Sequence, residues 1–444
     1  MRYHLIAVGG SVMHNLAINL KSMGHVVSGS DDEIYEPSRS RLLSHSLLPD
    51  TMGWHHDKID DDIDIVILGK HARTDNPELL KATQLGLRIM SFPEFVNEMS
   101  QASTRIVVAG SHGKTSTTSM IMHVMKSLGY DFDYLVGAQL SGFDTMVRLS
   151  GAEILVVEGD EYPSSCLDNS AKMLHYNATC AIITGVAWDH VNIYKTYEDY
   201  LEIFRVFLAQ MPKNSSVFFD MTDSQLLRIA TTESFQCTRV GYEAMADIKS
   251  NKVTYDNAVY PIKIFGNHNY KNLQAAYHAC QNIGISKEDF LSAITTFSGA
   301  SKRLELIKEA HPITYKDFAH APSKVRATTQ AIRSQYTKSK IAGVLELHTF
   351  SSLQKSFIPN YAGTADHVDF LIVFFDPSAI AQKRLPELEK SDLKTAINHK
   401  NMVVCNSPSD LEKACKQMLQ DSYDVLLVMS SGNLGGMDLT QLLA

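Results

Sequence analysis

Short apolar runs alternate with longer segments of mixed polarity along most of the chain. The runs at residues 4–8, 105–109 and 154–157 are dominated by Leu, Ile, Val and Ala, which is typical of strands buried on both faces of a sheet. Residues 114–128 instead carry apolar side chains at the three- and four-residue spacing of one helix face. Strands that alternate with helices predict an α/β fold with a mostly parallel sheet.

This alternation divides the chain into three parts. The first begins with a strand, a glycine turn, a helix and a second strand that is followed by Asp31. A small, polar stretch at residues 100–104 marks the first boundary. A third series of buried runs follows residue 297. We therefore expect three domains, at residues 1–100, 101–296 and 297–444.

Composition narrows the classes of function. The chain has 444 residues, 44% of them hydrophobic, and a net charge of -8. It has no basic excess to neutralise phosphates, which argues against nucleic acid as a partner. No apolar run is long enough for a membrane span, and the amino terminus does not resemble a signal peptide. The six cysteines are scattered, so we expect reduced thiols in a cytoplasmic protein.

The sequence GSHGKTSTT (110–118) follows the strand at 105–109 and opens the helix. It resembles a phosphate-binding loop but is shorter than G-x-x-x-x-G-K-[ST], because Val108 stands where the first glycine belongs. Glycines allow backbone amides to face an anion, and the helix amino terminus favours negative charge. We expect Lys114 to reach terminal phosphates from an exposed loop. A purely structural strand-to-helix turn is the alternative. The predicted nucleotide-binding residues are Gly110, Ser111, His112, Gly113, Lys114, Thr115 and Ser116.

Two other apolar runs end in possible metal ligands. Glu158 closes one run, and His190 follows the run at 180–186. Ligands gather at the carboxyl ends of parallel strands, so Thr115, Glu158 and His190 are predicted to converge on one site. Magnesium prefers oxygen, which makes the histidine unusual. Taken singly, Glu158 is also compatible with a solvated loop acid, and His190 with a hydrogen-bonded loop histidine.

The stretch GNHNYKNLQAAYHA (266–279) combines a turn with the start of a helix. Its side chains at His268, Asn269 and Asn272 suit hydrogen bonding to a purine edge. The alternative is that the asparagines cap the helix.

Near the start of the third part, SKRLEL provides Lys302 and Arg303, and YKDFAHAPSKV places Asp317 after a strand. In the second stretch, Pro322 is placed to begin the following helix. These side chains suit the ribose and phosphates of a nucleotide. Such residues are also common on protein surfaces.

The stretches GSHGKTSTT, EGDEY, WDH, GNHNYKNLQAA, SKRLE and DFAHAP occur in this order over essentially the whole chain. Together they resemble the Mur ligases, the ATP-dependent amide-forming enzymes of peptidoglycan synthesis, whose phosphate loop has this short form. The resemblance implies a three-domain Mur ligase architecture, with a central P-loop ATPase-like sheet between two Rossmann-like domains. It also implies ATP and Mg²⁺ as cofactors and an acyl phosphate intermediate.

The resemblance also implies roles for individual residues. Lys114, Glu158 and His190 are expected to be catalytic, and Thr115, Glu158 and His190 to bind the metal. Arg303 and Asp317 are expected to reach ATP from the third domain, which implies domain closure. The residues expected near the adenine are His268, Asn269 and Asn272.

Within the family, GSDDEIYEPSRSRLL (29–43) and DNSAKMLHY (168–176) are most similar to the murein peptide ligases. These join L-Ala-γ-D-Glu-meso-diaminopimelate to UDP-N-acetylmuramate in peptidoglycan recycling. LELHTFSSL (345–353) is more similar to the UDP-N-acetylmuramate–L-alanine ligases. Lys316-Asp317 stands where the murein peptide ligases have paired aspartates, and His320-Ala321 where they have paired histidines. The amine substrate is therefore either the tripeptide or L-alanine.

The first domain is expected to hold the UDP part of the substrate. The resemblance assigns Gly10, Ser11 and Met13 to its diphosphate and Asp31 to its uridine or ribose. From residues alone, this region also suggests a nicotinamide-dependent dehydrogenase. AVGGSVM, however, lacks the full G-x-G-x-x-G pattern, and neither a dehydrogenase nor a non-enzymatic nucleotide-binding regulator needs the second loop at residue 110.

Overall fold

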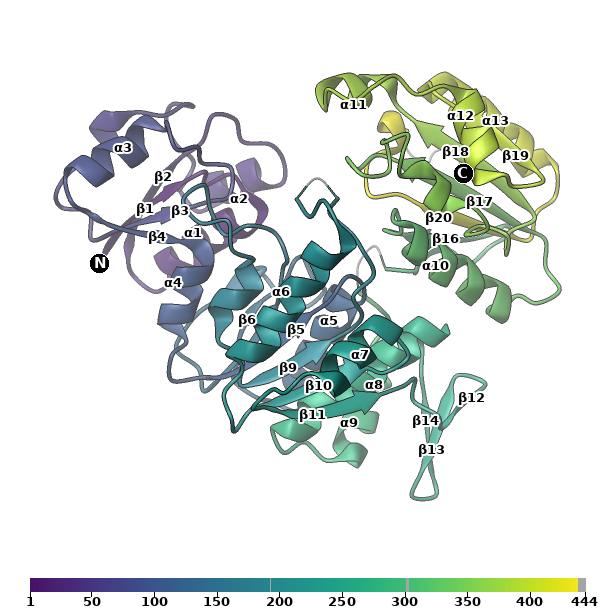
Figure 1. The fold of residues 1–444 in the computed structure, drawn as a ribbon, viewed down its shortest axis with the longest axis horizontal. Helices are drawn as coiled ribbons and strands as arrows, with labels where there is room; N and C mark the ends of the chain where they lie inside the picture. The colour runs from purple at the N-terminus through teal and green to yellow at the C-terminus, as the bar shows by residue number, and fades with distance from the viewer. Residues whose placement is uncertain (192, 301–302, 438–444) are drawn as a thin grey trace. The chain divides into compact units, whose positions relative to one another are not determined.

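A computed structural model of the protein describes residues 1–191, 193–300 and 303–437. Lys302 lies outside the described residues. Figure 1 shows the fold with its helices and strands labelled. The chain divides into two compact units. The first unit contains Met1–Val186, Leu201–Glu243 and Leu273–Ile294, and the second contains Ala187–Tyr200, Ala244–Asn272 and Thr295–Ala444. The three domain boundaries drawn from the sequence stay a prediction.

The first unit opens with a four-stranded parallel sheet of order β2-β1-β3-β4. Its β1 (Arg2–Ile6) and β3 (Ile65–Leu68) are central and almost completely buried. The helix α4 (Phe92–Met99) begins with a capping box between Ser91 and Glu94. The other elements are α1 (Ser11–Ser22), β2 (Val26–Ser30), α2 (Ser38–Ser44), the 3₁₀ helix η1 (His56–Lys58), α3 (Pro77–Gln84) and β4 (Arg88–Ser91).

A seven-stranded sheet of order β11-β10-β9-β5-β8-β6-β7 completes the first unit. All of its pairings are parallel except that of β7 with β6. The apolar run predicted at 105–109 is the central strand β5 (Thr104–Ala109), and the helix predicted after it is α5 (Lys114–Ser127). The remaining elements, of which α6 and α8 extend into the second unit, are β6 (Asp133–Leu135), β7 (Val147–Arg148), β8 (Ile154–Glu158), η2 (Lys172–Tyr176), β9 (Cys180–Ile183), α6 (Tyr197–Gln210), β10 (Ser216–Asp220), α7 (Ser224–Thr232), β11 (Thr238–Tyr242), α8 (Asn267–Asn282) and α9 (Lys287–Ile294).

Two buried asparagines of α1 join it to the far edge of the seven-stranded sheet. Asn15 Oδ1 accepts a hydrogen bond from the Met146 amide at 3.0 Å, and Asn19 Oδ1 accepts one from the Leu149 amide at 3.0 Å. Both asparagines are buried. Because the strand edge has no further strand to satisfy these amides, the asparagines take that place. They therefore fix α1 to the second sheet of the unit.

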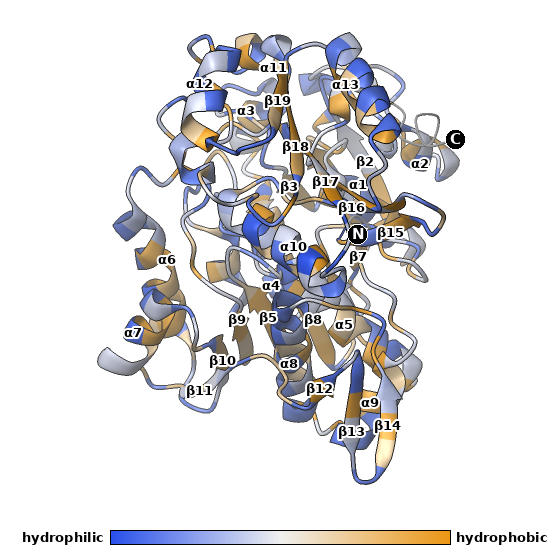
Figure 2. Ribbon diagram, turned by 90° about the vertical axis from the view of Figure 1, so that its right-hand side faces the viewer, coloured by the Kyte–Doolittle hydropathy of each residue, from blue (hydrophilic) through white to orange (hydrophobic). Residues whose placement is uncertain are grey.

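The second unit is built on a six-stranded sheet of order β15-β16-β20-β17-β18-β19, in which only β15 is antiparallel to its neighbour. Figure 2 shows its strands as largely apolar, whereas helices α10 and α13 mix apolar and polar positions. A small antiparallel sheet, β12-β13-β14, precedes it.

The elements of the second unit are β12 (Ile248–Lys249), β13 (Lys252–Tyr255), β14 (Ala258–Pro261), β15 (Glu305–Lys308), β16 (Ile313–Asp317), α10 (Pro322–Gln335), β17 (Ile341–Leu347), η3 (Ile358–Tyr361), β18 (Phe370–Phe375), α11 (Pro377–Gln382), α12 (Lys390–Ile397), β19 (Met402–Cys405), α13 (Pro408–Gln420), β20 (Val425–Met429) and η4 (Leu434–Gly436). In the part of the chain that the structure describes, no helix has the length and apolar character that crossing a bilayer requires.

We predict that Asn19→Ala destabilises the first unit. The substitution leaves the buried Leu149 amide without its acceptor, which costs about 1–3 kcal/mol. The measurement is the free energy of unfolding from urea titration, with exposed Asn282→Ala on α8 as the matched control. Equal stabilities of the two variants would contradict the role given to Asn19.

Candidate active site

The loop between β5 and α5 is shaped by two glycines with positive φ. Gly110 has φ 118° and Gly113 has φ 75°. A Cβ atom at Gly110 would lie 2.6 Å from Thr184 Oγ1 and 2.8 Å from the Gly185 carbonyl oxygen. Only glycine fits there, because the loop packs directly against the end of β9. Among the described residues no side chain caps the amino end of α5, which leaves that end suited to an anion.

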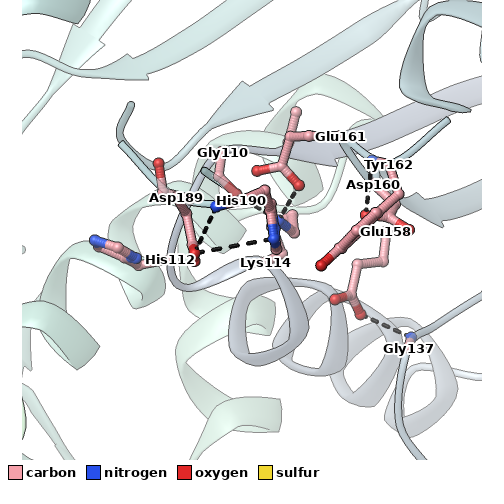
Figure 3. Close-up of polar contacts among 12 residues, drawn as sticks. Gly110, His112, Lys114, Gly137, Glu158, Asp160, Glu161, Tyr162, Asp189 and His190 are labelled. Carbon is pink, nitrogen blue, oxygen red and sulfur yellow. Dashed lines mark hydrogen bonds and ion pairs between the residues drawn. The ribbon is translucent and has the colours of Figure 1, made fainter. Parts of the chain in front are cut away.

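Lys114 is the first residue of α5 and is held in an ion pair. Its Nζ lies 2.5 Å from Glu161 Oε2 and donates to the Gly110 carbonyl oxygen at 2.7 Å (Figure 3). The Lys114 side chain is 15% exposed and that of Glu161 is 0% exposed. The expectation of an exposed loop lysine was therefore wrong. Burial alone would lower the pKa of Lys114, but attraction to Glu161 and Asp160 outweighs it and raises this pKa.

Thr115 and Glu158 come together as predicted. Thr115 Oγ1 donates to Glu158 Oε1 at 2.8 Å, and the Gly137 amide donates to Glu158 Oε2 at 2.8 Å. Thr115 is buried at the start of α5, and Glu158 ends β8. A hydroxyl and a carboxylate are hard oxygen ligands, so this pair fits Mg²⁺, which usually takes one or two carboxylates and completes its shell with phosphates and water.

The residues that follow β8 include two acids whose roles the sequence pattern did not indicate. Asp160 Oδ2 accepts from Lys172 Nζ at 2.9 Å. Burial opposes ionisation of Asp160, but Lys172 and Lys114 lower its pKa to about 2. Glu161 pairs with Lys114, as described above. The sequence feature that could have indicated these two acids is the presence of three acids within EGDE, at the end of a buried strand.

His190 belongs to the second unit. It follows Ile183, the last residue of β9, by seven positions, so it lies in a long loop and not at the strand end. Its neighbour Asp189 is buried and pairs with Lys324 of α10 at 3.3 Å. No group of three or more His, Cys, Asp and Glu side chains able to hold a metal occurs within 1–191, 193–300 and 303–437. His190 as a third metal ligand stays a prediction.

The second unit also gathers several of the residues predicted to bind ATP. Asp317 is buried and accepts from the Leu304 amide at 2.7 Å and the Ala319 amide at 2.6 Å. Burial lowers the pKa of His268, while the charge of Asp317 opposes this effect. The Arg303 guanidinium lies 4.6 Å from the centre of the Phe318 ring.

The two asparagines predicted near the adenine lie within α8. Asn269 Nδ2 donates to the Phe265 carbonyl oxygen at 2.9 Å, and Asn272 is buried. Asn269 thus donates to a backbone carbonyl at the beginning of its helix, whereas the capping alternative drawn from the sequence needs a side-chain oxygen that accepts from an amide. Contact of either residue with a nucleotide stays a prediction.

The turn after β1 and the end of β2 meet as the sequence suggested. The Gly9 amide donates to Asp31 Oδ2 at 2.7 Å, and Gly10 is the N-cap residue of α1. Burial, together with neighbouring Asp32, raises the pKa of Asp31 to about 6. Met13 is buried in the core, whereas Ser11 is exposed at the helix start. The Gly9 and Gly10 amides are thus engaged within the protein, and the first-turn amides of α1 are the ones suited to a diphosphate.

Three family models cover this chain. Residues 2–104 match the Mur ligase family catalytic domain, residues 108–280 the Mur ligase middle domain, and residues 302–432 the Mur ligase glutamate ligase domain. The UDP-N-acetylmuramate–L-alanine ligase of Caldicellulosiruptor bescii is 30% identical over 84% of this chain and 83% of its own length. The chain belongs to the Mur ligase family, whose members are ATP-dependent ligases that form amide bonds.

Two further relatives are similar over nearly the whole chain. The UDP-N-acetylmuramate–L-alanyl-γ-D-glutamyl-meso-2,6-diaminoheptandioate ligase of Escherichia coli is 25% identical over 98% of this chain and 96% of its own length. The crystal structure of a murein peptide ligase from Psychrobacter arcticus has a TM-score of 0.68 at 21% identity, covering 100% of this chain and 98% of that chain. The predicted fold class, an α/β chain with mostly parallel sheets and Mur ligase architecture, is confirmed.

We predict that Lys114→Met strongly lowers turnover and also destabilises the protein. Loss of one preorganised charge at the phosphates lowers kcat by about 10²- to 10³-fold, and the buried Glu161 left without a partner costs about 3–5 kcal/mol of stability. Phosphate release and urea unfolding measure the two effects.

The double variant K114M/E161Q separates them. A neutral Gln needs no counter-charge, so stability recovers while turnover stays lost. Lys213→Met, at an exposed lysine in the loop before β10, is the control. Recovery of turnover in the double variant would remove Lys114 from the mechanism.

Proposed function

We propose that the protein joins L-Ala-γ-D-Glu-meso-diaminopimelate to the lactyl carboxylate of UDP-N-acetylmuramate, with ATP converted to ADP and phosphate. The observation that carries the ligase chemistry is the loop lysine Lys114 beside the Thr115–Glu158 pair. The choice of the tripeptide rests on residues 29–43 and 168–176, which are similar to the murein peptide ligases, and on the Escherichia coli relative. Peptidoglycan recycling in the cytoplasm is the corresponding setting.

The chemistry requires two anions to meet. The substrate carboxylate attacks the γ-phosphorus of ATP, ADP leaves, and the amine then displaces phosphate from the acyl phosphate. Lys114 and the amides of residues 110–116 would neutralise the phosphates, which is the main contribution a protein makes to phosphoryl transfer. Thr115 and Glu158, with His190, would hold Mg²⁺, which supplies further neutralisation of the phosphate oxygens when bound.

Other predicted residues have binding roles in this proposal. Gly10, Ser11 and Met13 would contact the diphosphate of the UDP-sugar through the backbone, and Asp31 its uridine or ribose. Arg303 and Asp317 would contact ATP. The residues assigned to the adenine region are His268, Asn269 and Asn272.

L-Alanine is the second candidate amine. The relative from Caldicellulosiruptor bescii, an L-alanine ligase, has the higher identity, 30% against 25% for the Escherichia coli tripeptide ligase. Residues 345–353 also favour this reading. The two candidates share the nucleotide-sugar and differ only in the amine.

We predict phosphate release from ATP that requires both UDP-N-acetylmuramate and an amine. With the nucleotide-sugar saturating, kcat/KM for the tripeptide exceeds that for L-alanine by at least about tenfold. Coupled phosphate release measures the rates, and mass spectrometry identifies the product. Exclusive use of L-alanine would replace the tripeptide by L-alanine as the amine substrate. Phosphate release that depends on neither UDP-N-acetylmuramate nor an amine would exclude the ligase function.

We predict that Glu158→Gln raises the Mg²⁺ concentration for half-maximal phosphate release by about tenfold or more, because a neutral amide is a weaker ligand for a hard cation. A titration with MgCl₂ measures this. Glu153→Gln, on the exposed approach to β8, is the control. An unchanged magnesium requirement would remove Glu158 from the metal site.

A further inference from the structure

A cation outside the residues discussed so far lies against the segment that follows β8. Lys70 follows β3 at the carboxyl edge of the four-stranded sheet. Its Nζ lies 3.3 Å from the centre of the Tyr162 ring, one residue beyond Glu161. The edge that is expected to hold the nucleotide-sugar therefore meets the segment that follows β8.

This segment is held rigidly by its own backbone. Pro163 and Ala171 form an antiparallel bridge, and the Lys172 amide donates to the Tyr162 carbonyl oxygen at 3.0 Å. Lys172 is fixed in turn by its ion pair with Asp160. Two lysines thus approach Tyr162 and Asp160 from two parts of the first unit.

The three acids of this segment are accompanied by three lysines, of which, in the part of the chain that the structure describes, only Lys114 and Lys172 pair directly with a carboxylate. Asp160 pairs with Lys172 at 2.9 Å, whereas no carboxylate of the described residues lies within 4.0 Å of Lys70 Nζ. Burial and repulsion by Lys172 lower the pKa of Lys70 to about 8, with Asp160 opposing them. Like charges held close together are costly unless an anion joins them.

Asp160 also connects this pair of lysines with the phosphate loop. Its charge acts on Lys114, Lys172 and Lys70 alike. An anion placed at Lys70 would therefore lie against the segment that also carries Glu161, the partner of Lys114. The proposed nucleotide-sugar has two anionic parts. The turn at Gly10 is assigned to its diphosphate, which leaves the lactyl carboxylate.

We propose that Lys70, supported by Lys172, binds the lactyl carboxylate of UDP-N-acetylmuramate and orients it toward the phosphate loop. This inference rests on the proposed function, because it takes the nucleotide-sugar as the substrate. A charge-assisted hydrogen bond from an ammonium group to a carboxylate provides affinity and direction. Lys70 then distinguishes a muramoyl sugar from a sugar that lacks the lactyl group.

The test is the Kd of the nucleotide-sugar measured by calorimetry, without ATP or amine. Lys70→Met is expected to raise the Kd of UDP-N-acetylmuramate by about 10- to 100-fold, which is the effect of losing one charge-assisted hydrogen bond. UDP-N-acetylglucosamine has the same diphosphate but no carboxylate, so its Kd is expected to stay within about twofold. Lys70→Arg keeps the charge and is expected to retain most of the affinity for UDP-N-acetylmuramate.

Arg73→Met is the matched control. Arg73 lies three positions from Lys70, and its side chain is 84% exposed. Its removal therefore changes the net charge by the same amount and leaves Lys70, Lys172 and Asp160 in place. If Lys70→Met raises the Kd of both nucleotide-sugars equally, Lys70 contacts the diphosphate and the proposal is overturned. An unchanged Kd would also overturn it. If the wild-type protein binds UDP-N-acetylglucosamine and UDP-N-acetylmuramate with the same Kd, the lactyl group adds no affinity and the role given to Lys70 is excluded. If the wild-type protein binds neither nucleotide-sugar, the proposed function is excluded.

The pH profile gives a second readout. The Lys70 ammonium group lies against the Tyr162 ring, Lys172 and Asp160 act on its pKa, and Lys70 in turn lowers the pKa of His71. Lys70 is charged below its pKa of about 8, so the affinity for UDP-N-acetylmuramate should fall as the pH rises through this value. Lys70→Arg stays charged there and should flatten the profile between pH 7 and about 9.5. A wild-type profile that is already flat would contradict the proposal.

Discussion

The candidate site depends on the neutralisation of charge at the end of β8. Glu158, Asp160 and Glu161 fall within four consecutive positions, and together they would repel one another and any phosphate. Glu158 accepts hydrogen bonds from a hydroxyl and an amide. Asp160 pairs with Lys172, and Glu161 pairs with Lys114. Because Glu161 is fully buried, its lysine cannot leave without a replacement charge. The phosphates of ATP would therefore compete with Glu161 for the same ammonium group.

The parallel sheets explain why these groups meet at all. In the first unit, β1, β3, β5 and β8 all direct their carboxyl ends toward the loops that carry polar side chains. Ligand sites in open α/β sheets form at such edges. The second unit repeats the principle: β16 ends at Asp317, and α10 begins after the loop that contains His320. One architectural rule thus serves both units.

Much of the fold could be predicted from the sequence, because strands buried in a parallel sheet have uninterrupted apolar sequences. The strands β1, β5, β8 and β9 and the helix α5 were located in this way. The sheet β12-β13-β14 was not, because its short strands are largely exposed and lack such runs. Edge strand β15 was missed for the same reason.

The site was predicted less completely. Glycine spacing located the loop, and strand ends located Glu158. Lys114 and Glu161 are 47 positions apart, and periodicity carries no information about which distant charges pair. Burial of the loop lysine was therefore missed, and so was Lys70, since an isolated lysine after a strand has no pattern of its own.

The asparagines of α1 have a consequence for substrate length. The glycine turn at Gly10 opens this helix, and Asn15 and Asn19 attach the same helix to the sheet that carries Lys114. The separation between the turn and the phosphate loop is then set within one compact unit. In the proposed reaction, the two contacts of α1 would hold the diphosphate site and the phosphate loop in register for a ligand whose diphosphate and carboxylate are carried by one sugar ring.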